Sequence, residues 1–490
     1  MRSSNFDLVQ QIDEEHIKRS TLMKIEQMYT GCLAEAAYYI ESNGEVAIVD
    51  PLREPGPYLE RAAKDNARIK YILETHFHAD FVSGHLDLAS KTGAHIVFGP
   101  TAQPAFDAYV AKDNEDLKLG NITIRVLHTP GHTMESCTYL LIDENGKEHA
   151  IFSGDTLFIG DVGRPDLAVK SDLSREDLAG HLYDSLHIKI FPLADDVIVY
   201  PGHGAGSACG KNMSKETVDT LGHQKEVNYA LRALSKAEFI REVTDGLVAP
   251  PQYFPKNAVM NKMGYPAFDS VLSKGLTPLD LETFLLIYET QKALIIDTRK
   301  KEAFVTAHIP GAWYIGIEDN FAPWVGALVQ ELNQPILFLA DPGKEEEVVT
   351  RLARVGYDNT FGFLKGGMFT WTAAGKPVEQ LRELDADEFA KRFEIEPLNL
   401  LDARRKSEFD SEHILGAHNF PLDFIHQNIH TINRDKTYYV HCAGGYRSVI
   451  ACSILLSKGY SKVINIRGGY KALSRTDLMH SNFVEPKTLL

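Results

Sequence analysis

Four short segments of the 490-residue chain concentrate side chains that bind transition metals. The densest is 75–80, Thr-His-Phe-His-Ala-Asp, and three more place a histidine or an aspartate in a turn with glycine: 129–132 (Thr-Pro-Gly-His), 153–155 (Ser-Gly-Asp) and 200–204 (Tyr-Pro-Gly-His-Gly). Imidazole and carboxylate groups are common ligands of such metals. A single His-x-His pair is more often structural, but the four segments together predict one metal site.

A second kind of chemistry is indicated by one cysteine. Cys442 follows the β-rich run 438–441, and a glycine-rich loop leads from it to a helix predicted over Val449–Leu456. Backbone N–H groups and the helix dipole favour an anion at such a position, which activates a thiol as a nucleophile. The same loop would also stabilise the charge of a persulfide or of a bound sulfur oxyanion.

The metal-binding segments each follow a predicted strand. Loops at strand ends lie at the edge of a sheet, where a scaffold can direct several side chains to one point. Short β-rich runs predict the strands Glu45–Val49, Ile69–Leu73, His95–Phe98, Ile122–Leu127, Cys137–Ile142, His149–Phe152 and Val197–Tyr200. Helical patterns over Arg175–His187 and Ser214–Arg232 lie between strands, which indicates an α/β domain with helices on the faces of its sheets.

The second half of the chain is duplicated. The patterns Asp-x-Arg at 297–299 and His-Ile-x-Gly-Ala at 308–312 recur at 402–404 and 413–417, an offset of 402 − 297 = 105 residues. This period is too long for a solenoid repeat and predicts two copies of a small domain. The first copy has no cysteine in the position of Cys442, because Asp341 or its neighbour stands there; we therefore predict an inactive copy that serves as a spacer, a docking surface or a dimer contact.

These features divide the chain into five parts. A chain of 490 residues exceeds one hydrophobic core, and about 150 residues per domain gives roughly three domains. The proline-dense stretch 250–255 suits a linker. The predicted parts are an N-terminal extension (1–21), the metal-binding domain (22–250), a linker (251–261), the cysteine-less copy (262–378) and the copy with Cys442 (379–490).

Composition excludes several classes of function. Hydrophobic residues make up 44% and charged residues 24%, as in ordinary globular proteins, and 51 basic against 67 acidic residues give a net charge of −16, which disfavours nucleic acid and anionic membranes as partners. No apolar run reaches the ~18 residues of a membrane span, and the N-terminus lacks the apolar region of a signal peptide, so we expect a cytoplasmic protein. Five cysteines without a Cys-x-x-Cys pair make a disulfide framework improbable.

The order of the four metal-binding segments resembles that of the metallo-β-lactamase superfamily. This resemblance implies a four-layered αββα sandwich with the metal site at one edge of its two sheets. Dinuclear hydrolases of the superfamily read His-x-His-x-Asp-His, whereas Phe81 follows Asp80 here, so the second metal loses a donor. His76, His132 and Asp155 form the 2-His-1-carboxylate set of non-haem Fe(II) oxygenases and match the iron ligands of persulfide dioxygenases, a branch of this superfamily.

The same resemblance assigns the remaining residues of the first domain. His78, Asp80 and His203 are expected to surround the ligands and orient them. Arg164 is expected to pair with a carboxylate of the thiol carrier, an ordinary salt bridge being the alternative, and Tyr200 to contact the substrate. The sequence leaves the role of Cys209 open.

The two C-terminal copies resemble rhodanese sulfurtransferases, small α/β domains with a central parallel sheet. In the second copy Cys442 would carry sulfur, with Arg447 and Ser448 in the loop that binds the substrate. A Cys-x5 loop also occurs in tyrosine and arsenate phosphatases, but the upstream Asp-x-Arg segment favours rhodanese.

The whole chain therefore resembles bacterial fusions of a persulfide dioxygenase with two rhodanese domains, the first of them degenerate. The resemblance implies a mononuclear non-haem Fe(II) cofactor and the oxidation of a glutathione or coenzyme A persulfide by O₂ to sulfite and free thiol. Sulfur transfer through Cys442, with sulfite or thiosulfate as partner molecules, would join it in sulfide detoxification, and a homo-oligomer is expected. The alternatives are a thioester hydrolase like glyoxalase II and a non-enzymatic sulfur relay or sensor.

Overall fold

The computed structural model describes residues 23–167, 173–232, 235–318 and 320–485. The predicted N-terminal extension, 1–21, lies outside them. The chain forms two compact units. Unit 1 runs up to residue 250 and adds 254–267, and unit 2 takes 251–253 and the chain from 268 onward.

Unit 1 is built on two six-stranded sheets with the orders β1-β2-β3-β4-β5-β6 and β12-β11-β10-β9-β8-β7. The first sheet contains β1 (Lys24–Thr30), β2 (Glu35–Ser42), β3 (Glu45–Val49), β4 (Arg68–Glu74), β5 (His95–Phe98) and β6 (Tyr109–Val110). The second contains β7 (Glu115–Leu119), β8 (Ile122–His128), β9 (Cys137–Ile142), β10 (Glu148–Gly154), β11 (Ile198–Pro201) and β12 (Asp219–Thr220). The helices are α2 (Gly56–Lys64), α3 (His85–Thr92), α4 (Arg175–Ser185), the π-helix η1 (Leu186–Ile190), α5 (Leu221–Val227), α6 (Lys236–Thr244) and α7 (Phe254–Met263).

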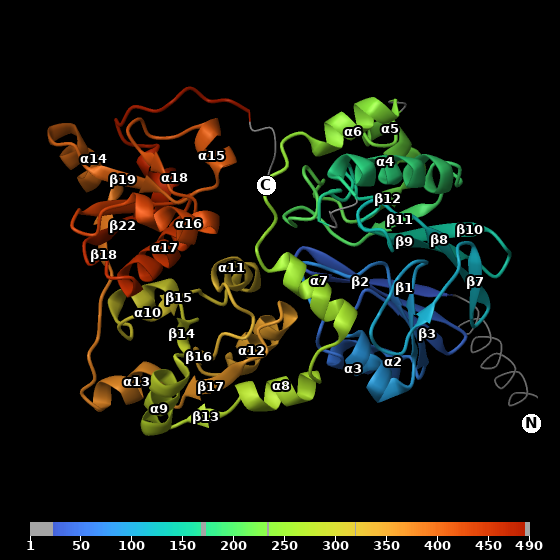
Figure 1. Cartoon of the computed structure of the whole chain (residues 1–490), viewed down its shortest axis with the longest axis horizontal. Helices are drawn as coiled ribbons and strands as arrows, with labels where there is room; N and C mark the ends of the chain where they lie inside the picture. The colour runs from blue at the N-terminus through green and yellow to red at the C-terminus, as the bar shows by residue number, and fades with distance from the viewer. Residues whose placement is uncertain (1–22, 168–172, 233–234, 319, 486–490) are drawn as a thin grey trace, which may run out of the picture. The chain divides into compact units, whose positions relative to one another are not determined.

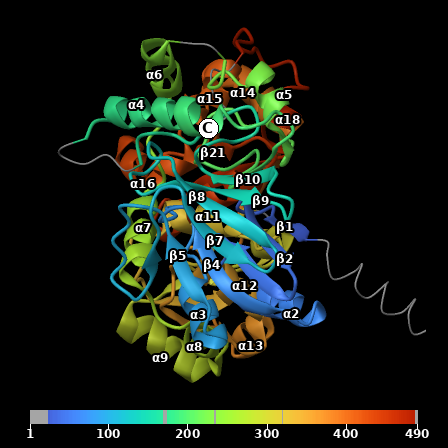
Figure 2. The same cartoon turned by 90° about the vertical axis from the view of Figure 1, so that its right-hand side faces the viewer.

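The two sheets of unit 1 pack face to face, with helices on their outer faces (Figures 1 and 2). Strand β2 shows how the sequence produces these layers. Tyr38 and Ile40 lie in the core between the sheets, whereas Tyr39 lies in the core beneath α2 and α3, because successive side chains of a strand point to opposite faces. A third apolar cluster joins the second sheet to α4 and α6. The predicted αββα architecture is therefore confirmed.

The strand directions explain why the metal-binding segments meet. In the second sheet β9 is antiparallel to both β8 and β10, and β11 is parallel to β10, so β8, β10 and β11 all end at one edge. The segments 129–132, 155 and 202–204 follow these three ends. The fourth segment, 75–80, follows β4 of the first sheet, and the hydrogen bond from Cys137 N to Thr75 O, 2.9 Å, joins it to the start of β9.

The seven predicted strands are confirmed to within two residues at each end, as is the helix Arg175–His187 up to its π-helical last turn. The helix predicted over Ser214–Arg232 is wrong for most of its length. Residues 219–220 pair with β11 as β12, and the Thr220 side chain then caps α5, which ends at Val227. Most of the predicted linker 251–261 is helical, since α7 begins at Phe254; Pro255 occupies its first turn, where no backbone N–H is needed.

Unit 2 contains two five-stranded parallel sheets with the same strand order, β13-β17-β16-β14-β15 and β18-β22-β21-β19-β20, which confirms the duplication. The first copy has β13 (Pro278–Leu279), β14 (Leu294–Asp297), β15 (Trp313–Tyr314), β16 (Ile336–Leu339), β17 (Thr360–Leu364), α8 (Phe268–Gly275), α9 (Leu281–Gln291), α10 (Lys301–Thr306), α11 (Phe321–Leu328), α12 (Glu345–Arg354) and α13 (Gly367–Ala373). The second has β18 (Arg382–Asp385), β19 (Asn399–Asp402), β20 (His418–Asn419), β21 (Tyr438–His441), β22 (Val463–Arg467), α14 (Ala386–Ile395), α15 (Lys406–Ser411), α16 (Ile425–Asn428), α17 (Tyr446–Ser457) and α18 (Gly469–Leu473), with short 3-10 helices at 422–424 and 429–431.

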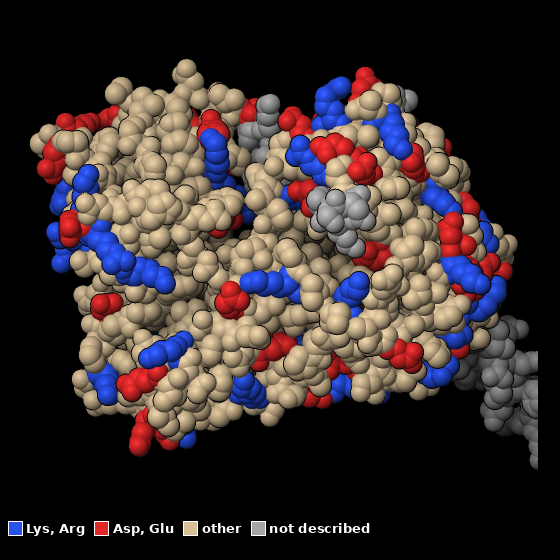
Figure 3. Space-filling view, in the orientation of Figure 1, with Lys and Arg blue, Asp and Glu red and all other residues tan. Residues whose placement is uncertain are grey.

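The surface carries charges of both signs. Figure 3 shows basic and acidic side chains interspersed over the visible face of each unit. Within the described residues, no helix has the length and apolar character needed to cross a membrane.

Candidate functional site

Three of the predicted metal ligands meet at the edge of the sheets of unit 1. His76 follows β4, His132 follows β8 and Asp155 follows β10, and all three side chains are buried. Asp155 Oδ2 lies 3.3 Å from His132 Nε2 and 3.9 Å from His76 Nε2. Two ligand atoms that are each about 2.1 Å from a shared metal lie roughly 3.0 to 3.4 Å apart at octahedral or tetrahedral angles. The group is therefore close to the geometry of a coordination sphere.

Hydrogen bonds set which ring nitrogen of each histidine faces the group. His132 Nδ1 donates to the backbone carbonyl of Arg164 at 2.9 Å, which leaves a lone pair on Nε2. His76 Nδ1 lies 3.0 Å from Thr75 Oγ1, and that hydroxyl donates to Asp50 Oδ2 at 2.8 Å. Because the hydroxyl proton goes to Asp50, the ring of His76 is the donor in its own bond and also presents an unprotonated Nε2.

The electrostatics of the group suit a bound cation. Burial, together with the neighbouring imidazoles His78, His132 and His203, holds the pKa of His76 well below its usual range, so that ring stays neutral. Neither carboxylate oxygen of Asp155 has a hydrogen-bond donor among the described residues, although both oxygens are buried. A buried carboxylate without a donor requires compensation, and a metal ion supplies it. The residues present therefore fit a metal.

The Thr75 hydroxyl gives a testable prediction about this site. Thr75→Val removes the relay from His76 to Asp50 at nearly constant volume, and we expect metal affinity to fall by about 10- to 100-fold. The measurement is metal retained at graded chelator concentrations. Thr138→Val is the matched control, because Thr138 is also buried and its hydroxyl bonds Thr129 rather than a ligand. Equal metal retention in both variants would contradict this role of Thr75.

A second cluster borders the first through Asp155. Asp80, His203 and Cys209 have potential ligand atoms within 4.8 Å of one another. His203 Nε2 lies 3.4 Å from Asp80 Oδ2 and 3.6 Å from Asp155 Oδ1, and its Nδ1 donates to the carbonyl of Ala34 at 3.1 Å. Burial and the nearby carboxylates raise the pKa of the Cys209 thiol well above its usual value. Cys209 therefore lies at the site, which the sequence left open.

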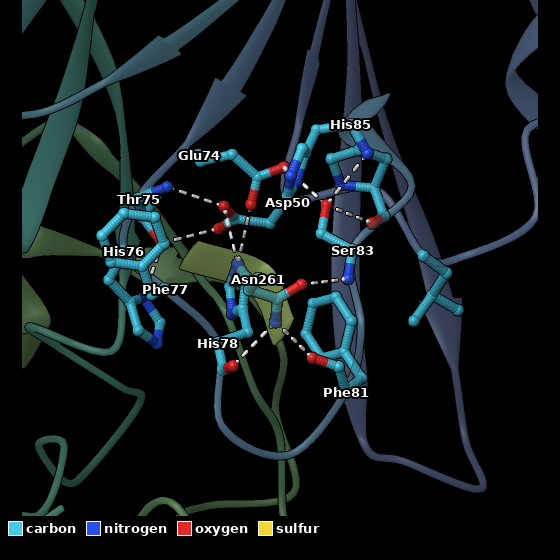
Figure 4. A network of polar contacts seen from close by, with 12 residues as sticks. Asp50, Glu74, Thr75, His76, Phe77, His78, Phe81, Ser83, His85 and Asn261 are labelled. Atoms are coloured by element: carbon cyan, nitrogen blue, oxygen red, sulfur yellow. Dashed lines mark hydrogen bonds and ion pairs between the residues drawn. The ribbon is translucent and has the colours of Figure 1, made fainter. Parts of the chain in front are cut away.

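His78 is turned toward two acidic side chains instead. Its Nε2 lies 3.0 Å from Asp50 and 3.5 Å from Glu74, and its ring stacks on Phe81 at a centroid distance of 4.3 Å (Figure 4). Burial alone lowers the pKa of an imidazole, but the two carboxylates here raise the pKa of His78 well above its usual range. Because Asp50 also accepts the hydrogen bond of the Thr75 hydroxyl, His78 is connected through Asp50 and Thr75 to the predicted ligand His76.

Asn261 of α7 fixes the loop that carries His76 and His78. Its Nδ2 donates to the carbonyls of His78 and Phe81 at 2.8 and 2.7 Å, and its Oδ1 accepts from the backbone N–H of Ser83 at 2.9 Å (Figure 4). These hydrogen bonds join residues that are 178 to 183 positions apart in the sequence. Sequence reasoning missed it, because a single asparagine in a predicted linker carries no signal of such a contact.

The two predicted substrate-binding residues of unit 1 are both engaged within the protein. The guanidinium of Arg164 is buried and bonds the Asp166 carboxylate through Nε and Nη2, both at 2.7 Å. A substrate carboxylate would have to displace Asp166. The ring of Tyr200 stacks on Phe152 at 5.3 Å and packs against Tyr38, next to the core between the sheets.

The sulfur-carrier candidate lies in the second copy of unit 2. Cys442 directly follows β21, and the backbone N–H of Gly445 donates to its Sγ at 3.1 Å. Arg447 makes two bonds to the Glu408 carboxylate, at 2.5 and 2.8 Å, and Ser448 donates to Asn465 at 2.7 Å. Arg447 and Ser448 belong to the first turn of α17, which begins at Tyr446, and not to the loop as predicted, because the helix starts three residues earlier than Val449. Their partners were not anticipated from the sequence. They anchor the first turn of α17, whereas the backbone N–H of Gly445 faces the sulfur.

The equivalent loop of the first copy contains no sulfur atom. Leu339 at the end of β16 pairs with Asp297, just as His441 pairs with Asp402, so Ala340 takes the place of Cys442. If the two copies are aligned at the starts of α12 and α17 instead, Asp341 takes the place of Cys442, because the loop before α12 is one residue longer than the loop before α17. Both positions agree with the predicted loss of the nucleophile.

Known proteins resemble both units. The model of the metallo-beta-lactamase superfamily matches residues 30–203, and the model of the rhodanese-like domain matches 280–374 and 385–476. A solved metallo-beta-lactamase from Staphylococcus aureus subsp. aureus COL is 31% identical, with a TM-score of 0.62, and the match covers 71% of this chain and 99% of that one. The chain belongs to the metallo-β-lactamase superfamily. Two rhodanese-like domains follow the lactamase-like domain, as predicted.

Two curated relatives of the lactamase-like domain differ in their named activities. A probable hydroxyacylglutathione hydrolase of Schizosaccharomyces pombe is 33% identical over 181 residues, which is 36% of this chain and 66% of that protein. The mitochondrial persulfide dioxygenase ETHE1 of Homo sapiens is 29% identical over 210 residues, 42% of this chain and 74% of that protein. The lactamase-like domain thus resembles both a hydrolase and a dioxygenase. The residues of the site are therefore needed to choose between the two activities.

Proposed function

We propose that the lactamase-like domain oxidises the persulfide of a small thiol, such as glutathione or coenzyme A, at a mononuclear Fe(II) site. The balanced reaction is RSSH + O₂ + H₂O → RSH + SO₃²⁻ + 2H⁺. The observation that carries the proposal is the group of His76, His132 and Asp155, which offers two unprotonated imidazole nitrogens and one buried carboxylate without a donor. This set is typical of non-haem Fe(II) oxygenases. The resemblance of the lactamase-like domain to the human persulfide dioxygenase also supports the proposal.

The protein's own residues would orient the ligands and accept protons. Bound Fe(II) would supply the activation of O₂. Thr75 and the Arg164 carbonyl hold the rings of His76 and His132 with Nε2 directed inward. The Nε2 atom of His203, 3.4 Å from Asp80, is placed to accept a proton that the reaction releases.

We further propose that Cys442 transfers sulfane sulfur. Its thiolate would attack the outer sulfur of thiosulfate, forming a Cys–S–S⁻ persulfide while sulfite leaves with the electrons of the broken S–S bond. The reverse step passes sulfur to sulfite. The N–H of Gly445 that faces Sγ supports this role, because it can stabilise negative charge on sulfur. Linking the two domains in one chain raises the effective concentration of a shared intermediate, which suits sulfide detoxification.

The oxygenase proposal is tested by O₂ uptake. Protein loaded anaerobically with Fe(II) is given glutathione persulfide or coenzyme A persulfide in an oxygen electrode, and sulfite is measured in parallel. We expect O₂ consumption with at least one of them and sulfite as the product. No uptake with either persulfide would overturn the proposal.

A second candidate function is thioester hydrolysis, as in the hydroxyacylglutathione hydrolases. The observation in its favour is the cluster of Asp80, His203 and Cys209 beside Asp155, which offers three further potential ligand atoms within 4.8 Å of one another. Phe81 offers no ligand atom. Hydrolysis of S-lactoylglutathione together with two metal ions per chain would favour this candidate over the oxygenase.

A further inference from the structure

The two rhodanese-like copies pack against each other through the helix that begins at the Cys442 loop. The backbone N–H of Tyr314, in β15 of the cysteine-less copy, donates to Ser453 Oγ at 3.0 Å, and Trp313 Nε1 donates to Ser457 Oγ at 2.9 Å. Both serines belong to α17 of the active copy. The cysteine-less copy therefore packs on the helix that follows the sulfur-carrier loop.

The same interface reaches the loop itself. The Tyr446 hydroxyl donates to the carbonyl of Gly316 at 3.0 Å, and its ring meets that of Tyr314 edge to face at 5.9 Å. Lys301, the first residue of α10, lies beside Gly445: its Nζ is 3.5 Å from the position that a Cβ on Gly445 would occupy. Gly445 is the residue whose N–H bonds Cys442 Sγ. An ammonium group from the cysteine-less copy thus stands at the loop.

The repeat explains why this ammonium is available. Lys301 corresponds to Lys406 of the active copy at the offset of 105 residues. Lys406 is held by Asp410 on its own helix, with both carboxylate oxygens 2.7 Å away. The residue equivalent to Asp410 is Val305, and the ion pair of Lys301 is a longer one, 3.7 Å, to the exposed Glu302. The cysteine-less copy has lost the aspartate that would neutralise this lysine.

We propose that Lys301 binds the oxyanion end of the sulfur substrate that reacts at Cys442, so that the cysteine-less copy completes the active site of its neighbour. The inference rests on the proposed sulfur transfer and names its substrate class: an inorganic sulfur oxyanion, thiosulfate as donor or sulfite as acceptor. The cation in the first turn of α17, Arg447, is already paired with Glu408. A dianion that approaches Cys442 therefore needs a further positive charge, and Lys301 supplies it.

The charge balance of the transfer step shows what the lysine would do. Cys–S⁻ and S–SO₃²⁻ enter with a total charge of −3, and Cys–S–S⁻ and SO₃²⁻ leave with the same charge. The S–S bond of thiosulfate breaks as the new S–S bond to Cys442 forms. Repulsion between the thiolate and the dianion opposes the encounter, and a partly exposed ammonium beside Gly445 offsets it in both directions.

The test compares Lys301→Met, Lys301→Arg and the control Lys406→Met in the full chain, with thiosulfate as donor and cyanide as acceptor. We expect Lys301→Met to raise the KM for thiosulfate by about 5- to 30-fold, with kcat changed less than about threefold. Lys301→Arg should keep the KM for thiosulfate close to that of the wild type, because arginine retains the positive charge. Lys406→Met should match the wild type because Asp410 already neutralises the charge of Lys406. A wild-type KM in Lys301→Met, or equal effects in both methionine variants, would overturn the proposal.

Alkylation of Cys442 separates a charge effect from a structural one. Iodoacetate is an anion and iodoacetamide is neutral, and a change in the pKa of the Cys442 thiol alters both rates alike. Loss of the cation should therefore lower the ratio of the iodoacetate rate to the iodoacetamide rate by about threefold or more. Equal slowing with both reagents would show a structural role and contradict the inference. If wild-type protein transfers no sulfur from thiosulfate, the proposed function fails; if it does and Lys301→Met is unaffected, this inference alone fails.

Discussion

Asp155→Asn is expected to remove the bound metal and to lower persulfide-dependent O₂ uptake by about 100-fold or more. The substitution keeps the volume of the side chain but replaces the carboxylate that faces both His76 and His132 with a neutral amide, which is a poor ligand. Sulfur transfer through Cys442 should stay within about twofold of wild type, because the change lies in the other unit. The measurements are metal content per chain and O₂ uptake.

Asp80→Asn is the matched control for this prediction. Asp80 belongs to the neighbouring cluster with His203 and Cys209, so a mononuclear site held by the first group keeps its metal in this variant. A melting temperature within a few degrees of wild type for both variants excludes general unfolding. Full metal content and wild-type O₂ uptake in Asp155→Asn would contradict the assigned ligand set.

Cys442→Ser is expected to abolish sulfur transfer, by about 1,000-fold or more, because a hydroxyl can neither form the persulfide nor act as a comparable nucleophile. Oxidation of added glutathione persulfide should stay within about twofold of the wild type, since that reaction is assigned to unit 1. The measurements are thiosulfate–cyanide transfer and O₂ uptake on the same preparation.

Cys452→Ala is the control for Cys442→Ser. Cys452 lies on α17 of the same copy, and burial raises the pKa of its thiol, so it has no role as a thiolate. We expect this variant to transfer sulfur like the wild type. Retained transfer in Cys442→Ser, or its loss in Cys452→Ala without loss of fold, would refute the assignment of the carrier.

The backbone of the site could be predicted from local sequence. His76, His132, Asp155 and Cys442 each follow a β-rich run closely, and strand ends at one sheet edge bring such residues together whatever the intervening sequence. The duplication was equally visible, because a constant offset of 105 residues does not depend on structure. These features depend on periodicity and spacing, which a sequence displays directly.

The partners of these side chains could not be predicted. Asn261 reaches the His78 loop from a helix at the end of unit 1, and Lys301 reaches the Gly445 loop from the other copy. Such contacts depend on tertiary packing across 100 residues or more and leave no local pattern. The expected role of Arg164 shows a different limit: Asp166 is only two residues away, but the sequence does not show that the guanidinium turns toward this carboxylate.

The mononuclear iron oxygenase site is tested most directly by the stoichiometry of metal, O₂ and sulfite in one experiment. Protein reconstituted with Fe(II), and separately with Zn(II), is freed of excess metal and given glutathione persulfide under a known amount of O₂. We expect one iron per chain, one O₂ consumed for each sulfite formed, and no O₂ uptake by the zinc form. Two metal ions per chain, hydrolysis of S-lactoylglutathione and no O₂ uptake by the iron form would contradict this assignment.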